Sequence, residues 1–391
     1  GNPPDVESRG LGDVYKRQRK MNTDRLVKTF QELISIDSPS FGERKMADEL
    51  TVRLRKLGFT VSEDRAGEYY GGTAGNLYAF RKGSIPGKPL LFSTHMDTVE
   101  PAEGKKAVLH GDGRITSGGA TVLGADCMAG TAALLEAVTE LEEEQADCRA
   151  LEVLFFIGEE KHLRGSAVFD FSCVQAEESY ILDLSGPAGT AAIQAPTLID
   201  FEIVVHGKAA HAGFAPEQGV HAIRIAANAV ARMDMGRTGA SMTVNIGHIE
   251  GGVKATNIVP ERCSLKGEVR SYSHEQALEE MKKIEGIFQE EAEKAGGSCE
   301  VQFTVPLQAY RVPETHSCVK RFRRVCEELG LPVRLVPTFG GSDQSNLALH
   351  GVQGLVLASA MEQVHSCEEY TTVSGLETVA EIVKGLMQER A

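Results

Sequence analysis

A histidine and an aspartate two residues apart close an apolar run in the segment Leu90-Leu-Phe-Ser-Thr-His95-Met-Asp97. The apolar run predicts a buried strand, and open α/β sheets bind ligands beyond the carboxyl ends of their strands. Alternation along the strand puts His95 and Asp97 on one side of it. The carboxylate of Asp97 could then hold the imidazole of His95 in one tautomer, as in many metal-binding histidines. Taken alone, the pair is a weak signal, and an ordinary polar strand end is the favoured interpretation.

Carboxylates stand at three further element ends. Asp126 begins a predicted helix, where the helix dipole favours an anion. Glu159 and Glu160 follow a second apolar strand, and Asp183 follows a third. Adjacent glutamates repel each other, so a cation beside them would stabilise the pair. An N-cap aspartate and a solvated acidic pair remain the ordinary alternatives for each site by itself.

A second histidine, His365, follows the predicted strand Gly354–Ala358 and completes the set. Two histidines and three carboxylates, with one glutamate to spare, suit two zinc ions that share a carboxylate. The expected ligand sets are His95 with Asp183, His365 with Glu160, and Asp126 as the bridge between them. The spare carboxylate, Glu159, would be the general base that takes a proton from water. We expect two Zn²⁺, for which Co²⁺ or Mn²⁺ could substitute.

Composition limits the classes of protein to which the chain could belong. It has 391 residues, of which 42% are hydrophobic and 25% charged, as in ordinary globular proteins with two domains. With 41 basic and 55 acidic residues, the net charge is −14, so nucleic acid is not expected as a partner. No apolar run approaches the roughly 20 residues of a transmembrane helix, so no membrane association is expected.

The eight cysteines are scattered and form no Cys-x-x-Cys pair, which argues against a disulfide framework and a structural zinc ribbon. The sequence contains no signal-peptide pattern, and we expect a cytoplasmic protein. Residues 1–20 mix glycine, proline and charge without periodicity. We expect them to be a disordered or non-native leader that ends near Met21.

Strand and helix patterns alternate along most of the chain, which predicts an α/β domain with a central mixed sheet flanked by helices. We expect this catalytic domain to comprise residues 21–195 and 308–391. The intervening residues 196–307 instead follow the order βαββαβ, with a long helix whose capping box is formed by Ser273 and Gln276. This order predicts an inserted α+β domain of the ferredoxin-like type.

The motifs HMDTV, LGAD, GEE, LD, HGKAAHAG, ATNIVP, GEVRS, GGSD and VHSCEEY follow one another along the chain. In this order they resemble the co-catalytic zinc metallopeptidase family of peptidase T, glutamate carboxypeptidase and the aminoacylases, above all its peptidase T-like branch. The resemblance extends from about Met21 to the C-terminus. It implies hydrolysis of amide bonds in small peptides by the metal ligands named above. It gives Glu159 the role of base and Asp97 the support of His95.

The resemblance also assigns roles within the inserted domain, which it identifies as a lid or dimerisation domain and hence a route to a homodimer. It implies that His211 stabilises the oxyanion, often from the partner subunit, and that Asn257 and Arg270 hold the substrate carboxylate. A guanidinium suits that task because it can bind a carboxylate through two parallel hydrogen bonds. A polar loop histidine is the alternative for His211. The glycine-rich turn that contains Ser342 and Asp343 could present backbone donors to the substrate.

The chain departs from the family pattern after the bridging aspartate, where the family usually has an acidic or amide residue followed by lysine. Cys127 and Met128 stand there instead. A thiol beside two zinc ions could be oxidation-sensitive or become an extra ligand, so we predict an active but thiol-sensitive enzyme. Two alternatives remain open: an amidohydrolase that deacylates N-acyl amino acids with the same metals, and a catalytically impaired homologue that only binds.

Overall fold

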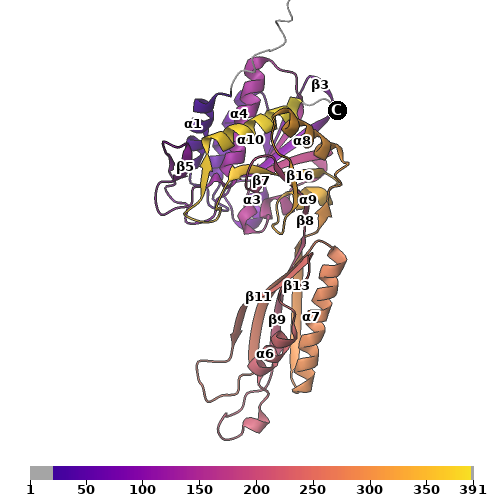
Figure 1. The fold of residues 1–391 in the computed structure, drawn as a ribbon. Helices are drawn as coiled ribbons and strands as arrows, with labels where there is room; N and C mark the ends of the chain where they lie inside the picture. Colours follow the sequence, from indigo (N-terminus) through magenta and orange to yellow (C-terminus); the bar gives the residue numbers. More distant parts are fainter. Residues whose placement is uncertain (1–20, 389–391) are drawn as a thin grey trace, which may run out of the picture.

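The computed structural model describes residues 21–388 and consists of two domains, the smaller of which extends away from the larger (Figure 1). The expected leader, residues 1–20, lies outside the described part of the chain. The larger domain contains both the beginning and the end of the described chain, so the smaller domain is an insertion, as predicted. Within residues 21–388, no helix is both long enough and apolar enough to cross a membrane.

The larger domain is built on a nine-stranded mixed sheet in the order β1-β2-β6-β3-β7-β16-β8-β14, with β15 beside β8. Its central strands β6, β3, β7 and β16 are parallel, whereas β2 and β8 run antiparallel to them. The strands are β1 (Thr60–Glu63), β2 (Leu77–Arg81), β3 (Ile85–His95), β6 (Arg149–Phe156), β7 (Glu178–Ser185), β8 (Thr190–Ala195), β14 (Tyr310–Arg311), β15 (Arg334–Pro337) and β16 (Gln353–Met361). A separate small sheet contains β4 (Ala107–Leu109), β5 (Arg114–Ser117) and β17 (Tyr370–Thr372).

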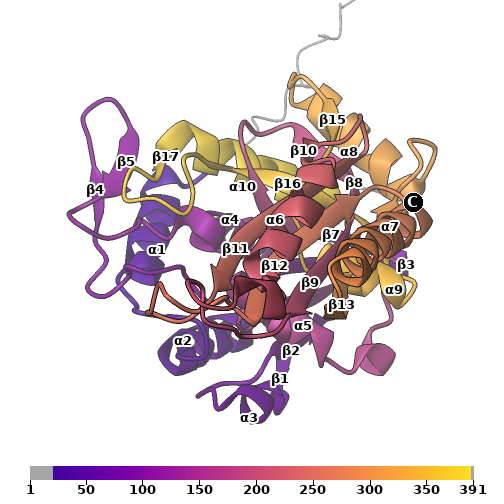
Figure 2. The same cartoon turned by 90° about the horizontal axis from the view of Figure 1, so that it is seen from below.

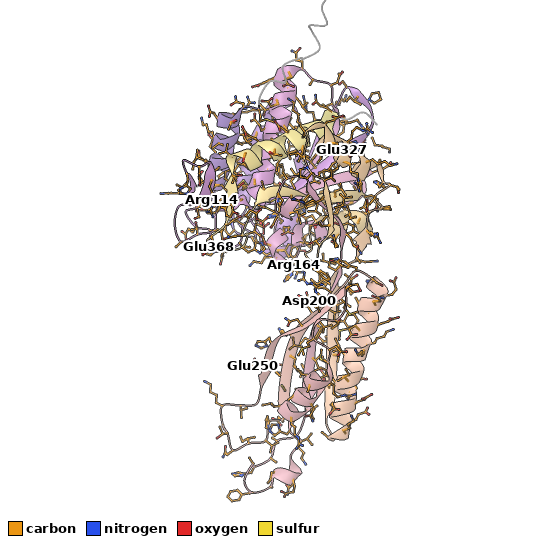
Figure 3. The ribbon with its side chains drawn as sticks, viewed as in Figure 1. Arg114, Arg164, Asp200, Glu250, Glu327 and Glu368 are labelled. Carbon is orange, nitrogen blue, oxygen red and sulfur yellow. The ribbon has the colours of Figure 1, made fainter. Side chains whose placement is uncertain are left out.

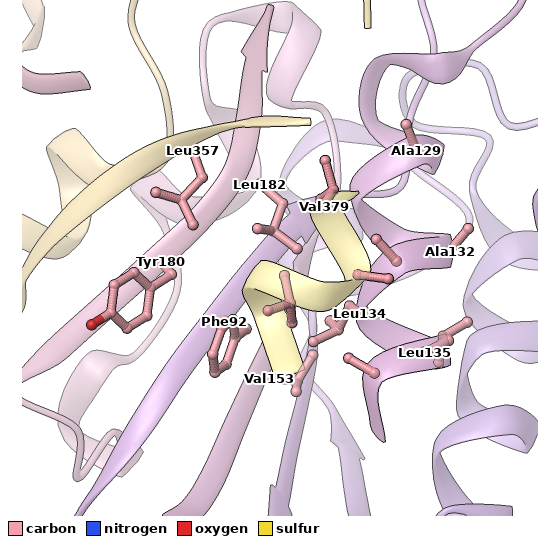
Figure 4. Packing of buried hydrophobic residues seen from close by; sticks show 14 of the residues in the cluster. Phe92, Ala129, Ala132, Leu134, Leu135, Val153, Tyr180, Leu182, Leu357 and Val379 are labelled. Carbon is pink, nitrogen blue, oxygen red and sulfur yellow. The ribbon is translucent and has the colours of Figure 1, made fainter. Parts of the chain in front are cut away.

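Helices cover both faces of the central sheet. They are α1 (Thr23–Ile34), α2 (Arg44–Lys56), α3 (Ala66–Tyr70), α4 (Ala125–Glu144), α5 (Arg164–Ala167), α8 (Ser317–Glu328), α9 (Gln344–Leu349) and α10 (Val373–Gln388). The helix α4 is buried on nearly all sides, because it lies between the sheet, α1 and α10. Figure 4 shows Leu134 of this helix among Phe92, Val153 and Val379. Burial of each such leucine or valine contributes roughly 1.5–3 kcal/mol to the stability of the folded protein. These contacts hold α4, and with it Asp126 in its first turn, against the sheet.

The smaller domain is an antiparallel sheet in the order β10-β11-β12-β9-β13, with two helices on one face. Its elements are β9 (Thr197–His206), α6 (Ala222–Arg232), β10 (Gly236–Arg237), β11 (Met242–Gly251), β12 (Arg262–Ser271), α7 (His274–Lys294) and β13 (Ser298–Leu307). Figure 2 shows α6 and α7 side by side on this face. The side chain of Ser273 accepts the backbone N–H of Gln276 at 3.2 Å and caps α7. Apart from the added two-residue β10, the order is the ferredoxin-like one that the sequence predicted.

The parallel strands of the larger domain bring their carboxyl ends to one edge of the sheet. His95 is the last residue of β3, and Glu159 and Glu160 form a 3₁₀ turn after β6. Asp183 was predicted to follow its strand, and this was wrong: it lies inside β7, because β7 continues to pair with β16 as far as Ser185. The apolar run in this strand ends at Leu182, but the backbone hydrogen bonds between β7 and β16 continue beyond it. A polar side chain does not interrupt these bonds, because they are made by the backbone alone.

Candidate metal centre

Asp126 lies between two histidines at this edge of the sheet. Its Oδ1 atom is 3.0 Å from Nε2 of His95, and its Oδ2 atom is 3.2 Å from Nε2 of His365. Each imidazole therefore contacts a different oxygen of one carboxylate. A carboxylate that bridges two metal ions, each bound by one histidine, requires this arrangement.

A further carboxylate accompanies each histidine. Oδ1 of Asp183 is 3.6 Å from Nε2 of His95, and Oε1 of Glu160 is 3.1 Å from Nε2 of His365. Although this Glu160 oxygen is buried, it makes no hydrogen bond of acceptable geometry. A cation would satisfy it, and nitrogen and carboxylate ligands are those that divalent zinc prefers. The structure thus brings the five predicted ligands together, and their chemistry fits two divalent cations.

The backbone of Asp97, more than its side chain, orients His95. Nδ1 of His95 is 2.9 Å from the carbonyl oxygen of Asp97 and 3.4 Å from its carboxylate. A carbonyl can only accept, so Nδ1 carries the proton and Nε2 is left to bind a metal. The carboxylate of Asp97 instead accepts the backbone N–H groups of Glu159 at 2.9 Å and Glu160 at 3.2 Å. Asp97 therefore fixes both the imidazole and the turn that carries the two glutamates.

Glu369 supports the other side of the centre, and the sequence patterns did not single it out. Its carboxylate accepts the backbone N–H of Gly124 at 2.6 Å and that of Asp126 at 2.9 Å. Gly124 has a φ of +81°, a left-handed conformation that favours glycine, so the turn into α4 is both sharp and clamped. The adjacent acidic pair in VHSCEEY was the only sequence signal for this role. The ammonium group of Lys105 is buried and donates to the hydroxyl of Thr98 at 3.0 Å, and it is close enough to Glu369 for the two charges to interact.

Glu43 is a second supporting carboxylate that sequence reasoning missed. It is fully buried, and it accepts the backbone N–H of Gly158 at 3.0 Å and that of Phe41 at 2.7 Å. Gly158, at φ +55°, directly precedes Glu159, so Glu43 holds the turn from behind. Burial and the neighbouring charge of Asp97 raise the pKa of Glu43 to about 7. No local pattern identified it, since Glu43 only precedes α2 in the sequence.

Without metal ions, the clustered carboxylates of the centre repel one another, and their pKa values are shifted. Burial, followed by the charge of Asp126, raises the pKa of Asp183 to about 8, and burial raises the pKa of Glu159 well above its usual range. The hydrogen bond to Asp126 and the nearby carboxylate of Glu160 raise the pKa of His365 to about 10. Divalent cations would favour the opposite state, with ionised carboxylates and neutral imidazoles.

Glu159 lies beside the ligands without being paired in either set. One ligand atom from each of His95, Glu159 and Glu160 falls within a single 4.8 Å group. Asp343 is close enough for its charge to act on Glu159; it is 1% exposed and accepts the hydroxyl of Ser166 at 2.5 Å. Ser342 is also buried. Of these two predicted substrate-binding residues, Asp343 therefore lies near the centre, and Ser342 precedes it in the chain.

Cys127 is buried directly below the ligands. Its Sγ atom donates to the carbonyl of Leu182 at 2.9 Å, and one group within 4.8 Å contains Sγ and ligand atoms of His95, Asp126 and Asp183. The following residue, Met128, is fully buried in the core. This position therefore packs against the strands and has no access to solvent.

The predicted residues of the smaller domain lie at its two opposite ends. His211 forms a bridge with Ile258, and the N–H of Ala212 bonds to the carbonyl of Asn257 at 2.9 Å, before β12 begins. Arg270 lies at the other end of β12, which spans roughly 30 Å at about 3.3 Å per residue. Figure 3 shows Asp200 at the junction with the larger domain and Glu250 farther along the smaller domain. One copy of the chain therefore does not bring His211 to its own metal centre in this conformation.

Arg270 is fully engaged within the chain. Its Nε and Nη2 atoms donate to both carboxylate oxygens of Glu268 at 2.9 and 3.1 Å. Its Nη1 atom donates to the carbonyl of Phe339 at 2.7 Å, which ties it to the larger domain beside the glycine-rich turn. Arg270 is therefore placed at the domain junction.

Comparison with known proteins covers both domains. Residues 194–296 match the model of a peptidase dimerisation domain, and residues 76–184 match that of peptidase family M28. The crystal structure of aminopeptidase PepT from Bacillus cereus is 35% identical, with a TM-score of 0.90 over 94% of this chain and 98% of that chain. A tripeptidase from Staphylococcus aureus is 33% identical, with a TM-score of 0.92 over 95% and 99% of the two chains. The uncharacterized protein YqjE of Bacillus subtilis is 35% identical over 95% of this chain and 100% of its own length.

Proposed function

Since the chain belongs to the co-catalytic metallopeptidase family that includes aminopeptidase PepT, we propose that it is a di-zinc aminopeptidase of small peptides. The observation that carries this proposal is the position of Asp126, with one carboxylate oxygen 3.0 Å from His95 and the other 3.2 Å from His365. Asp183 and Glu160 accompany the two histidines and supply the remaining protein ligands.

Zinc ions bound here would lower the pKa of water and polarise the amide carbonyl of the substrate. Glu159 takes the proton of the attacking water and returns it to the leaving amine. Asp97 keeps this base in position through the backbone N–H groups of residues 159 and 160, while its carbonyl holds His95.

His211 is suited to stabilise the oxyanion. Its Nδ1 atom accepts the backbone N–H groups of Gly213 and Phe214, both at 3.1 Å, so Nε2 carries a proton that it can donate. Because His211 lies at the far end of its own domain, we propose that a second copy of the chain supplies it in a homodimer. The match of residues 194–296 to a peptidase dimerisation domain supports this assembly.

Arg270 is proposed to bind the carboxylate of the peptide. For this the guanidinium exchanges its contact with Phe339 for the substrate, and a closing movement of the smaller domain would accompany that exchange. Asn257 lies beside His211 at the far end of the smaller domain, so we propose that the second copy of the chain supplies it together with His211. Ser342 and Asp343, which are both buried, are proposed to lie beside the bound substrate. A cytoplasmic location is also proposed, since all eight cysteines are unpaired.

The test is an assay of the purified chain after chelation and after reconstitution with Zn²⁺, Co²⁺ or Mn²⁺. Di- and tripeptides with free amino termini should be hydrolysed only by the metal-loaded protein. Matched N-acyl amino acids should be poor substrates. Preference for the N-acyl compounds would make the protein a deacylase, and zinc binding without turnover on either set would make it a binding homologue. Full activity after verified metal removal would contradict the two-metal mechanism.

A further inference from the structure

A cavity lies at the opposite end of the strands that lead to the metal centre. Its volume is about 390 Å³, and it is lined by the beginnings of β3, β6 and β7 and by the first turns of α8. The basic residues of its lining are Lys88, Arg149, Lys320, Arg321 and Arg324. Only Glu177 and Glu178 are acidic, so the lining has an excess of three positive charges in a chain whose net charge is −14.

Arg149 is buried in this lining without forming an ion pair with any described residue. It is 5% exposed, and its Nη2 atom donates to the carbonyl of Lys88. Its Nε and Nη1 atoms are buried and have no hydrogen-bond partner, and the described residues offer it no ion pair. The guanidinium packs against the backbone of Gly87, where a Cβ atom would stand 2.7 Å from Nη2. Burial and the charge of Arg321 lower the pKa of Arg149, and the opposing charge of Glu178 does not offset them.

The two acidic residues of the lining are already paired with other residues of the lining. Glu178 accepts hydrogen bonds from Arg321 and from the hydroxyl of Ser317, and Glu177 lies 3.7 Å from Nζ of Lys88. Arg321 is 5% exposed, and its Nε atom is a further buried donor without a partner. Three buried N–H groups on two guanidinium groups therefore remain unsatisfied. Such groups are costly unless an acceptor reaches them.

The start of α8 adds to the positive electrostatic potential of the cavity. Lys320, Arg321 and Arg324 are three to seven residues beyond Ser317, so they share one face of the helix with it. The dipole of this 12-residue helix favours an anion near its N-terminus. Lys320 is exposed at the mouth of the cavity and could reach an anion that the buried arginines hold.

We propose that this cavity binds a small phosphate-class anion, either inorganic phosphate or the phosphate group of a small metabolite. Guanidinium groups match phosphate oxygens through paired, charge-assisted hydrogen bonds, and a dianion would neutralise most of the excess charge. The site is separate from the metal centre, because β3, β6 and β7 run from one to the other. On β3, Leu90 lines the cavity and His95 lies at the metal centre. On β7, Glu178 lines the cavity and Asp183 lies at the metal centre. Bound anion stabilises the folded protein by mass action.

The experiment titrates the zinc-loaded full chain with inorganic phosphate at constant ionic strength, with chloride as the balancing anion, and follows Tm. The double variant Arg149→Met/Lys320→Ala should bind phosphate at least about tenfold more weakly than the unchanged protein. Lys45→Ala, an exposed lysine on α2 outside the cavity, is the matched control and should titrate like the unchanged protein. Any phosphate bound at the metal centre acts equally in all three proteins, so only their difference reports on the cavity.

Identical titrations of the unchanged protein and the double variant would overturn the proposal. If Arg149→Met does not fold, Lys320→Glu takes its place, since this exposed side chain has no structural partner to lose among the described residues. It should weaken phosphate binding severalfold, and an unchanged affinity would again be contradictory. A parallel titration with glycerol 3-phosphate distinguishes the sources: tighter binding than inorganic phosphate indicates a phosphorylated metabolite, and weaker binding indicates the free ion.

Discussion

The carboxylate of Glu369 accepts the backbone N–H of Asp126 at 2.9 Å. The same carboxylate also accepts the N–H of Gly124 at 2.6 Å, so one buried side chain fixes the turn from which the bridging aspartate projects. Glu369 lies in the loop that carries His365. This loop therefore carries one proposed metal ligand and positions another through the backbone.

Glu369→Gln should weaken zinc binding, by about 10- to 100-fold, which is typical when a group that orients a metal ligand is altered. The amide keeps the size of the side chain but removes the charge and one of the two acceptor oxygens. Competition with a chromophoric chelator measures the affinity. The neighbouring, exposed Glu368→Gln is the control and should bind zinc normally. Equal affinities of the two variants would show that Glu369 does not position Asp126.

Glu159 and Glu160 are adjacent but should respond differently to the same substitution. Glu159→Gln should retain both zinc ions and lose about 10²- to 10⁴-fold in kcat, the usual contribution of a general base. Glu160→Gln should instead lose affinity for the ion that His365 binds, because Oε1 of Glu160 lies 3.1 Å from that imidazole. Metal analysis and kinetics on the same samples give both quantities. Equal zinc loss in the two variants would contradict this division.

His211→Ala should lower kcat while its zinc content stays normal, because the side chain lies far from the ligands of its own subunit. If a second copy supplies the imidazole, mixing the inactive His211→Ala and Glu159→Gln proteins should restore activity. A heterodimer has one site with both groups intact, so a fully exchanged equal mixture should recover about a quarter of normal activity. Each variant mixed with itself is the control. No recovery after verified subunit exchange would argue against a shared site.

The stability of the protein should depend on pH through Glu43. Burial raises its pKa from 4.5 to about 7 in the folded protein, so the folded state binds more protons than the unfolded state between these values. Its contribution to stability is present below about pH 4.5 and is lost as the pH rises through 7. Glu43→Gln mimics the protonated form, so its stability relative to the unchanged protein should increase by up to about 3 kcal/mol over that interval. Urea unfolding at a series of pH values measures this, and a constant difference would be contradictory.

Cys127 should be inert toward alkylating reagents in the folded protein. The sequence led us to predict a thiol-sensitive enzyme, but the side chain is fully buried and its Sγ atom donates to the carbonyl of Leu182. Burial raises the pKa of this thiol, which further disfavours reaction. The exposed Cys367 follows His365 by two residues and is the expected site of any inhibition. Cys367→Ser should then abolish sensitivity, and labelling of Cys127 in the native protein would show the opposite.

Four of the five proposed ligands were predictable from local patterns, because His95, Glu160 and Asp183 follow apolar strand patterns and Asp126 begins a helix pattern. Period-two and period-3.6 patterns are local, and parallel strands must bring their carboxyl ends to one edge. His95, Asp126 and Glu160 could therefore be grouped from the order of these patterns along the chain. The inserted domain and the cap at Ser273 followed from equally local signals.

Only the tertiary structure decided how these residues are held and which residues can act together. Glu43 and Glu369 approach the centre from distant segments, and no periodic pattern relates them to Gly158 or Asp126. The separation of His211 from Arg270 follows from the direction and length of β12. The basic cavity likewise joins Arg149 of β6 to the beginning of α8. Such contacts depend on strand order and on packing between remote segments, whereas a sequence pattern records only the neighbours along the chain.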